Sequence, residues 1–349
     1  MSTSRQNRVN MADVARESGV SVTTVSLVLS DKPGLPAETR QRVLDAARQL
    51  GYRIKTPSLT AHVGSIHTAG LLVKMGPGEV PQANQFYSHV IAGIESACRQ
   101  RFIDLLFAGL PVDGKNRPVD LPPLLQKGGP DGLLLVGAQV DEEFMRVLSQ
   151  AGKPIVLVDG YSDGDRFDSV VSDNIGGIHQ AMRHLVQMGH GQIGFIGGSA
   201  DAYPSFLERR AGYLSFTEKH NLPSYTVDCY SDLKCATDAT LGFLQKNPQI
   251  TALVGCNDEI AVGAMHAITE LGCRVGEDIS VIGFDDIATA KSVLPPLTTL
   301  QVDKLNMGRM AVQLLINRSE IPEASLMTMV LRPKLMIRNS VKMLQAQDA

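Results

Sequence analysis

The sequence predicts a chain of two parts: an N-terminal all-α helix-turn-helix head, and an α/β core of two doubly wound parallel-sheet lobes. The head follows from the helical spacing of apolar residues, interrupted by short turns, up to about residue 55. The core follows from short apolar runs that alternate with helical segments beyond residue 68. The length of 349 residues leaves room for both parts, since a domain takes about 100 to 200 residues.

Two short helices are expected at the start of the chain. Asn10 is a good N-cap, Asp13 three residues later completes a capping box, and Gly19 is a typical helix stop. Ser21 is the expected N-cap of the second helix, which spans residues 22–29. Two helices joined by so tight a turn form the helix-turn-helix pattern, in which the second helix is presented to the major groove of DNA.

A third helix, from about Pro36 to a stop at Gly51, is expected to support the first two. Residues 56–68 lose the helical spacing and gain small polar residues, which is typical of a linker. We therefore expect a head of residues 1–55, a hinge linker of residues 56–68 and a core of residues 69–349.

Two series of strands are expected in the core. Apolar runs without polar alternation are typical of parallel strands that are covered on both faces. Because the two series resemble each other, we expect two similar lobes, an N-lobe of about residues 69–172 and 301–325 and a C-lobe of about residues 173–300 and 326–349. Ligands of such paired lobes bind in the crevice at the carboxyl ends of the strands. The expected strands are residues 70–73, 104–108, 132–136, 155–158, 193–196, 225–229, 252–255 and 279–284.

The charge of the chain is unevenly distributed. The formal net charge is −3, but residues 1–55 contain nine basic and five acidic residues, a net charge of +4, which leaves −7 for the remainder. A basic module on an acidic body predicts that the head binds a polyanion. A basic helix face that is only solvated is the alternative.

The N-terminus has no apolar signal region and no apolar run is long enough to span a membrane, so we expect a cytoplasmic protein without a membrane partner. The five cysteines lack CxxC spacing, which argues against zinc and a disulfide framework. Residues 189–194 match GxGxxG, but the expected helix precedes this segment and the strand follows it, the reverse of a dinucleotide site. We therefore expect no cofactor, no metal and no catalytic constellation.

Polar and aromatic side chains gather at the expected strand ends and helix starts of the core. Carboxylates, amides and a guanidinium can bond vicinal hydroxyls, and aromatic faces stack on the apolar side of a sugar ring. The set therefore predicts a pocket for a sugar-like ligand, although Asp and Asn at strand ends also commonly cap helices. Its members are Asn84, Phe86, Tyr87, Asp159, Arg209, Tyr230, Asn257 and Asp285.

Several segments resemble the lactose/galactose repressor (LacI/GalR) family, and the resemblance covers almost the whole chain. In the head it rests on residues 10–15 and 19–26, with Thr39-Arg40 and Leu50-Gly51-Tyr52 after them. In the core it rests on residues 188–190, 257–264, 281–286 and 296–299. The resemblance implies a transcriptional regulator, expected to be a repressor, with a periplasmic-binding-protein-like core that binds a small effector and dimerises.

The resemblance also implies which head residues meet DNA. Leu27 replaces a residue that is commonly polar or cationic, and an apolar side chain can meet a thymine methyl but cannot pair with guanine. We therefore expect a preference for A·T at that step. By position, Val22, Thr23 and Leu27 read bases, Ser21, Thr24, Ser26 and Thr39 contact phosphates, and Asn10 and Met11 lie close to the DNA backbone.

The linker departs from the family pattern. Members carry a hinge helix whose leucine wedges into the minor groove nine residues after the tyrosine that Tyr52 matches, and this chain has Ala61 there. Leu59 lies two residues earlier, and Pro57 would break a helix already under way. Either Leu59 is a displaced wedge or the operator is bent without one.

In the core, the eight pocket residues match the hydroxyl-reading and stacking positions of sugar-binding relatives, including ribose-type receptors. Val302 stands where a Gln is common, and Gln301 or Asp303 are the possible substitutes. The implied function is control of a palindromic operator by a homodimer, with a sugar, a sugar phosphate or a purine as effector. The alternatives are a soluble sugar receptor that does not bind DNA and a sugar-acting enzyme with Asp159 and Asp285 as its carboxylate pair.

Overall fold

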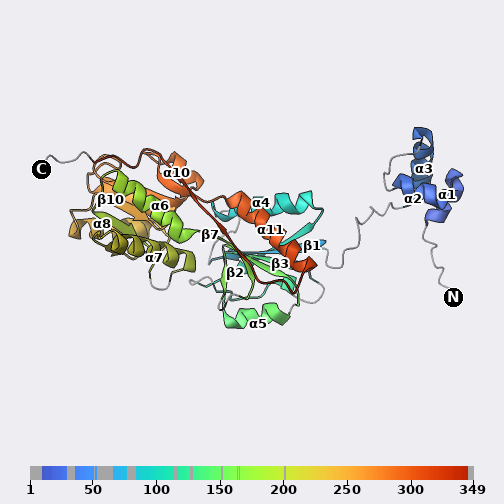
Figure 1. The fold of residues 1–349 in the computed structure, drawn as a ribbon, viewed down its shortest axis with the longest axis horizontal. Helices are drawn as coiled ribbons and strands as arrows, with labels where there is room; N and C mark the ends of the chain where they lie inside the picture. Colours follow the sequence, from blue (N-terminus) through green and yellow to red (C-terminus); the bar gives the residue numbers. More distant parts are fainter. Residues whose placement is uncertain are drawn as a thin grey trace. The chain divides into compact units, whose positions relative to one another are not determined.

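The computed structural model describes residues 10–29, 36–50, 52, 66–76, 84–113, 117–125, 129–150, 152–162, 164, 166–199 and 202–344. The chain divides into two compact units, Met1–Val63 and Gly64–Ala349. Each unit has its own hydrophobic core. Figure 1 shows the helices of the first unit and the α/β elements of the second. The predicted fold class, a helical head and a two-lobed α/β core, is confirmed.

The head consists of α1 (Met11–Ser18), α2 (Val22–Leu29) and α3 (Ala37–Gln49). The predicted capping box is present: Asn10 Oδ1 accepts hydrogen bonds from the N–H groups of Ala12 (2.8 Å) and Asp13 (3.2 Å), and the Asp13 carboxylate accepts from Asn10 N–H. Gly19 ends α1 in the left-handed region at φ 67°. Apolar side chains from all three helices form the buried core of the head, which includes Val14, Val25, Val28, Val43 and Ala47.

The N-lobe contains a six-stranded parallel sheet in the order β13-β7-β5-β3-β1-β2. Helices cover both faces, α4 and α11 on one and α5 on the other (Figure 1). A short pair of strands, β4 and β6, lies beside it. The elements are β1 (Thr68–Met75), α4 (Tyr87–Gln100), β2 (Asp104–Pro111), β3 (Gly132–Val136), β4 (Gln139–Val140), α5 (Glu142–Gln150), β5 (Ile155–Val158), β6 (Tyr161–Ser162), β7 (Asp168–Ser172), α11 (Lys304–Glu320) and β13 (Thr328–Leu331), with a 3-10 turn at Pro123–Leu125.

The C-lobe contains a second six-stranded sheet in the order β14-β12-β11-β10-β8-β9, in which β14 alone is antiparallel to its neighbour. The two orders correspond strand by strand, so the predicted likeness of the two series is confirmed. The elements are α6 (Asn174–Gln187), β8 (Ile193–Ile196), α7 (Pro204–Lys219), β9 (Tyr225–Val227), α8 (Leu233–Lys246), β10 (Ala252–Gly255), α9 (Asp258–Glu270), β11 (Ser280–Asp285), α10 (Ala288–Ser292), β12 (Thr298–Gln301) and β14 (Lys334–Met336).

The expected boundary of the lobes is wrong near the C-terminus. Residues 326–349 were expected in the C-lobe, but β13 pairs with β7 in the N-lobe sheet, with Met329 opposite Val170. The chain returns to the C-lobe with β14 and the residues after it, where Ser340 Oγ donates to the carbonyl of Val281 and Leu344 N–H donates to that of Met188. The error arises because the chain crosses between the lobes three times, from β7 to α6, from β12 to α11 and from β13 to β14 (Figure 1).

Two glycines allow α4 and α11 to pack closely in the N-lobe. A Cβ at Gly93 would collide with the main-chain oxygen of Leu305, and a Cβ at Gly308 would collide with that of Val90. The backbones of the two helices are therefore in direct contact, an approach that only residues without a side chain allow. This contact fixes α11 to the N-lobe immediately after the second crossing.

Candidate ligand-binding cleft

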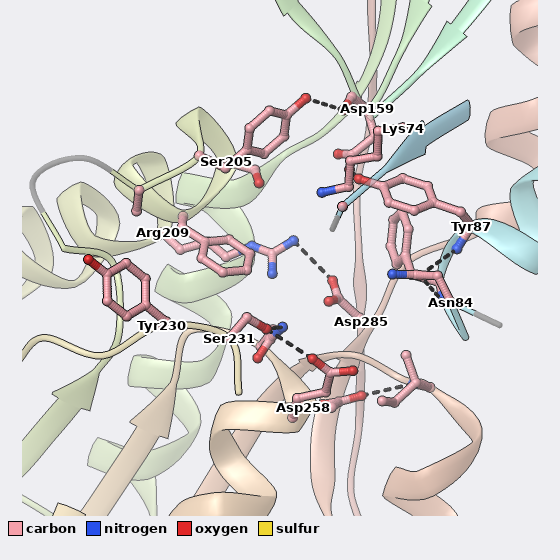
Figure 2. A pocket seen from close by; sticks show the side chains of 18 of the residues that line it. Lys74, Asn84, Tyr87, Asp159, Ser205, Arg209, Tyr230, Ser231, Asp258 and Asp285 are labelled. Carbon is pink, nitrogen blue, oxygen red and sulfur yellow. Dashed lines mark hydrogen bonds and ion pairs between the residues drawn. The ribbon is translucent and has the colours of Figure 1, made fainter. Parts of the chain in front are cut away.

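The carboxyl ends of both sheets face a cavity of about 340 Å³ between the lobes of the core (Figure 2). Its volume is in the range typical of small-molecule sites, about 300–1,000 Å³. All eight side chains that the sequence predicts for a ligand pocket line it: Asn84, Phe86, Tyr87, Asp159, Arg209, Tyr230, Asn257 and Asp285.

Asp159 and Asp285 occupy equivalent places in the two lobes. Asp159 directly follows β5 and Asp285 ends β11, strands that correspond in the two sheet orders. Both residues have positive φ angles, 44° and 109°, which are uncommon for residues other than glycine. This backbone conformation turns each carboxylate out of its strand, and Figure 2 shows both facing the cavity.

Arg209 is held rigidly in the cleft. Its Nε donates to Asn174 Oδ1, its Nη1 to the carbonyl of Cys256 and its Nη2 to Asp285 Oδ1, each at 2.9 Å. The guanidinium carbon lies 3.8 Å from the centre of the Phe284 ring, and the residue is buried. Burial raises the pKa of Asp285, and Arg209 opposes that rise. The pair presents a fixed planar donor beside a carboxylate.

Asp159 is bonded on one side only. Its Oδ2 accepts from the hydroxyl of Tyr87 at 2.9 Å, and its carbonyl accepts from the hydroxyl of Tyr203 at 2.7 Å. Its Oδ1 is buried without a hydrogen-bond partner among the described residues. Burial raises the pKa of Asp159 to about 6, although Arg209 acts against it. An unpaired buried carboxylate oxygen is costly, so it is suited to a donor that a ligand brings.

Two of the predicted pocket residues also serve as caps. Asn84 Oδ1 accepts from the N–H groups of Phe86 and Tyr87, both at 3.0 Å, at the start of α4. Asn257 Oδ1 accepts from Ile260 N–H at 2.9 Å at the start of α9, and its Nδ2 donates to Ser231 Oγ at 2.8 Å. The capping interpretation of these asparagines therefore applies, and it leaves the Nδ2 atom of Asn84 for a ligand.

Tyr230 lies at the rim of the cavity and is 67% exposed. The residues considered as substitutes for a missing Gln do not line the cavity. Val302 is buried, Gln301 Nε2 donates to Asp286 Oδ2 at 2.8 Å, and Asp303 caps α11 by accepting from Asn306 N–H at 3.1 Å.

Sequence reasoning missed four lining residues with polar side chains that matter for the chemistry: Lys74, Tyr203, Ser205 and Asp258. Lys74 is the second-to-last residue of β1, so the rule that ligands bind at the carboxyl ends of strands could have found it. Asp258 is buried, accepts from Thr299 Oγ1 at 2.5 Å and from Ile287 N–H at 2.8 Å, and burial raises its pKa to about 8.

Hydrogen bonds join the two lobes beside the cavity. Gln85, before α4, donates through Nε2 to Thr289 Oγ1 at 2.9 Å and accepts from Thr289 N–H at 3.2 Å in α10. Elsewhere Tyr161 donates to Glu208 Oε2 at 3.1 Å, from β6 to α7. These contacts hold the lobes together in this structure.

In the head, the residues predicted to meet DNA lie mainly on the surface. Val22 is 46% exposed at the first position of α2, and Thr23 beside it is exposed, while Leu27 is half-buried. Ser21 Oγ accepts from Thr24 N–H at 3.1 Å, which confirms the predicted N-cap. Met11 is exposed and Thr39 is half-buried. The side chain of Ser26 and the whole of Leu59, with Pro57 and Ala61, lie outside the described residues.

In the described part of the chain, no helix combines the length and hydropathy that a membrane span requires. Within the same ranges, no cluster of three or more His, Cys, Asp or Glu side chains is arranged to hold a metal ion. The segment 189–194 does connect a preceding helix, α6, to a following strand, β8, as the sequence predicts.

The head and the core each match a known family. The sequence model for bacterial regulatory proteins of the lacI family matches residues 10–54, and that for a periplasmic binding protein-like domain matches residues 182–341. A ribose operon repressor of Haemophilus influenzae (strain ATCC 51907 / DSM 11121 / KW20 / Rd) is 30% identical over 335 residues, covering 95% of this chain and 98% of the relative. The transcriptional repressor PurR of Haemophilus influenzae (strain PittEE) is 30% identical over 337 residues, with the same coverage.

Solved structures of transcriptional regulators also superimpose on this chain. The lac repressor dimer bound to operator and the anti-inducer ONPF superimposes with a TM-score of 0.69 at 25% identity, covering 96% of this chain and 100% of that one. The complex of the transcriptional regulator CelR with cellobiose gives a TM-score of 0.67 at 26% identity, covering 95% and 100%.

Proposed function

Because the chain belongs to the lacI family of bacterial regulatory proteins, we propose that a sugar-like effector bound between Asp159 and Asp285 controls its affinity for operator DNA. The chain is a DNA-binding transcriptional regulator. The predicted resemblance and the predicted class of function are confirmed. The partners of such a regulator are operator DNA, a second copy of the chain and a small-molecule effector.

The single observation that carries the effector chemistry is the unpaired Oδ1 of buried Asp159. A hydroxyl of a ligand in the cavity would supply the missing donor, and the Arg209 guanidinium would donate to a hydroxyl oxygen from the opposite lobe. Phe86 offers an apolar ring face on the same wall. Relatives named for ribose and cellobiose favour a sugar, and those named PurR make a purine the second candidate.

For the head, we propose that α2 enters the major groove with Val22, Thr23 and Leu27 toward the bases. The exposure of Val22 supports this, because the core of the head is completed by Val25 and Val28 and does not need it. An exposed side chain that is not part of the hydrophobic core is available to contact DNA. We expect Val22→Gln to change operator preference by about 1–3 kcal/mol at one base pair while leaving the melting temperature of the head unchanged.

We propose that the effector acts by changing how the lobes meet, and hence how two heads of a homodimer are spaced on a palindromic operator. Only a ligand with different affinities for two lobe arrangements can do this. The bonds of Gln85 with Thr289 join the two lobes, so a change in how the lobes meet would have to alter them.

We also propose that the core binds its ligand without turnover and that the protein acts in the cytoplasm, where operator DNA is found. The relatives that the chain matches are named as repressors, and Asp285 is engaged by its ion pair with Arg209 at 2.9 Å. A sugar-acting enzyme of the usual kind needs two carboxyl groups that are both free to act on the substrate. Detection of sugar turnover that is lost in Asp285→Asn would overturn this part.

The test is operator affinity at one fixed salt concentration, measured with and without pentoses, hexoses, their phosphates and purines, because salt alone changes DNA affinity strongly. A parallel thermal-shift screen identifies ligands, since a ligand at about 100 times its Kd stabilises the protein by about 2.7 kcal/mol. We expect one sugar class to raise the melting temperature and change operator affinity, and Asp159→Leu to abolish both effects. A purine effect without any sugar effect would overturn the pocket chemistry.

A further inference from the structure

The start of α7 is an uncapped helix N-terminus that points at the cavity. Tyr203 precedes the helix, Pro204 is its first residue, and no side chain caps it. Ser205 is 3% exposed, yet neither its Oγ nor its backbone N–H makes a hydrogen bond to any residue that the structure describes. By contrast, Asn84 accepts from a backbone N–H at the start of α4 and Asn257 from one at the start of α9, both at the cavity.

Ser205 is a buried polar side chain aimed into the site. It lines the cavity, and Figure 2 shows its hydroxyl directed toward the same part of the cavity as the ammonium group of Lys74. No described residue accepts a hydrogen bond from this hydroxyl. Because it lines the cavity, it is available to an acceptor group of a ligand.

Positive charge reinforces these donors. Lys74 Nζ lies 5.2 Å from the centre of the Tyr203 ring and 5.3 Å from that of Tyr87, so the two rings hold the ammonium against the cavity wall. Arg209 follows one turn after Ser205 on α7. The helix itself adds a partial positive charge at its start.

We propose that the effector carries an anionic group, a phosphate ester or a carboxylate, that binds at Ser205 and Lys74 at the start of α7. This inference rests on the proposed function and specifies its ligand, with the hydroxyls of the same molecule meeting Asp159 and Arg209. The anion accepts from Ser205 Oγ–H and N–H at the start of the helix and adds an ionic contact with the Lys74 ammonium, which a neutral sugar cannot make.

The two carboxylates predicted to read ligand hydroxyls, Asp285 and Asp159, are compatible with anion binding. Asp285 is neutralised by its ion pair with Arg209, whose Nη2 lies 2.9 Å from Asp285 Oδ1. Burial raises the pKa of Asp159 to about 6, so a nearby anion makes its protonation easier still. A protonated Asp159 remains able to bond a ligand hydroxyl, because it keeps an acceptor oxygen.

The experiment is titration calorimetry on the full-length protein with matched pairs of probes. The pairs are ribose and ribose 5-phosphate, and glucose with glucose 6-phosphate and gluconate; inorganic phosphate serves as a competitor. The variants are Lys74→Met, which keeps the stem and removes the charge, and Ser205→Ala, which removes Oγ. Lys246→Met, on the exposed end of α8, is the matched control.

We expect the charged member of at least one pair to bind about tenfold or more tightly than its neutral partner, as one charged hydrogen bond would give. Lys74→Met and Ser205→Ala should each reduce that ratio severalfold, and Lys246→Met should not. Phosphate and gluconate distinguish the two possible anions. Tight binding of a neutral sugar with no preference for its charged partner overturns this inference and leaves the proposed function intact, whereas binding of purines alone, or of nothing, overturns both.

Discussion

Removing the Arg209 guanidinium should have the largest effect of any single change in the cleft. In Arg209→Met the side chain keeps much of its apolar stem but loses three hydrogen bonds of 2.9 Å. The loss leaves Asp285 as a buried carboxylate without its ionic partner. Breaking a buried ion pair from one side costs about 3–5 kcal/mol, a large part of the free energy of unfolding of a typical domain.

The cost should depend on pH in a defined direction. Burial already raises the pKa of Asp285, and without Arg209 the pKa rises further. In the variant, a protonated Asp285 needs no partner charge, so the destabilisation should be full at pH 8 and should shrink as the pH falls toward 5. The double variant Arg209→Met/Asp285→Leu should recover most of the lost stability, since it leaves no unpaired charge.

The assay is urea unfolding of the wild-type protein, the two single variants and the double variant, followed by far-ultraviolet circular dichroism at pH 8 and pH 5. Arg209→Lys is the matched control, because it keeps the charge and loses the planar fork that bonds three acceptors. A loss below about 1 kcal/mol for Arg209→Met at pH 8, or a loss that is equal at both pH values, would refute the reasoning.

Three further predictions concern other parts of the core. Gly93→Ala should destabilise the protein by about 2 kcal/mol in thermal unfolding, because the added Cβ meets the backbone of Leu305; a neutral result would contradict the close helix contact. The free energy of unfolding should fall between pH 5 and pH 8 by up to about 1.4 kcal/mol per pH unit, since Asp258 keeps its proton up to a pKa of about 8 when folded but loses it near 3.8 when unfolded; a flat profile in urea unfolding would exclude this. Gln85→Ala and Thr289→Val should be non-additive by about 1 kcal/mol in effector affinity, and additive effects would show that their hydrogen bonds are not made.

Short apolar runs in the sequence predicted eight of the described strands, and six were missed: β4, β6, β7, β12, β13 and β14. β12 contains Thr298 and Thr299, which are polar yet fully buried. They are satisfied by partners remote in sequence: Thr298 N–H donates to Ser340 Oγ, and Thr299 Oγ1 donates to Asp258. No local pattern reveals such partners. β13 failed for a different reason, since its alternating exposure belongs to an edge strand reached by a crossing.

In the cleft, too, sequence reasoning predicted some of the lining residues and missed others. The rule that ligands bind at the carboxyl ends of strands found all eight predicted lining residues, but it missed the start of α7, where Tyr203 precedes the helix and Ser205 lies in its first turn. Nor does the rule separate a cap from a ligand contact. Asn257 proved to be bonded at both ends of its amide, a fact that depends on the position of Ser231 in another loop.

Two of the three crossings between the lobes are helix N-caps with nearly the same backbone angles, φ −72° and ψ 79° at Asp173 and φ −77° and ψ 74° at Asp303. Each carboxylate accepts from a backbone N–H in the first turn of its helix, which stabilises the first turns of α6 and α11 against unwinding by about 1 kcal/mol each. A relative rotation of the lobes would then change the φ and ψ angles of the few residues at these crossings, while α6 and α11 move as rigid helices. Because the backbones of α11 and α4 are in contact at Gly93, a rotation of α11 about Asp303 would also move α4, with no flexible side chains between the two helices at that point.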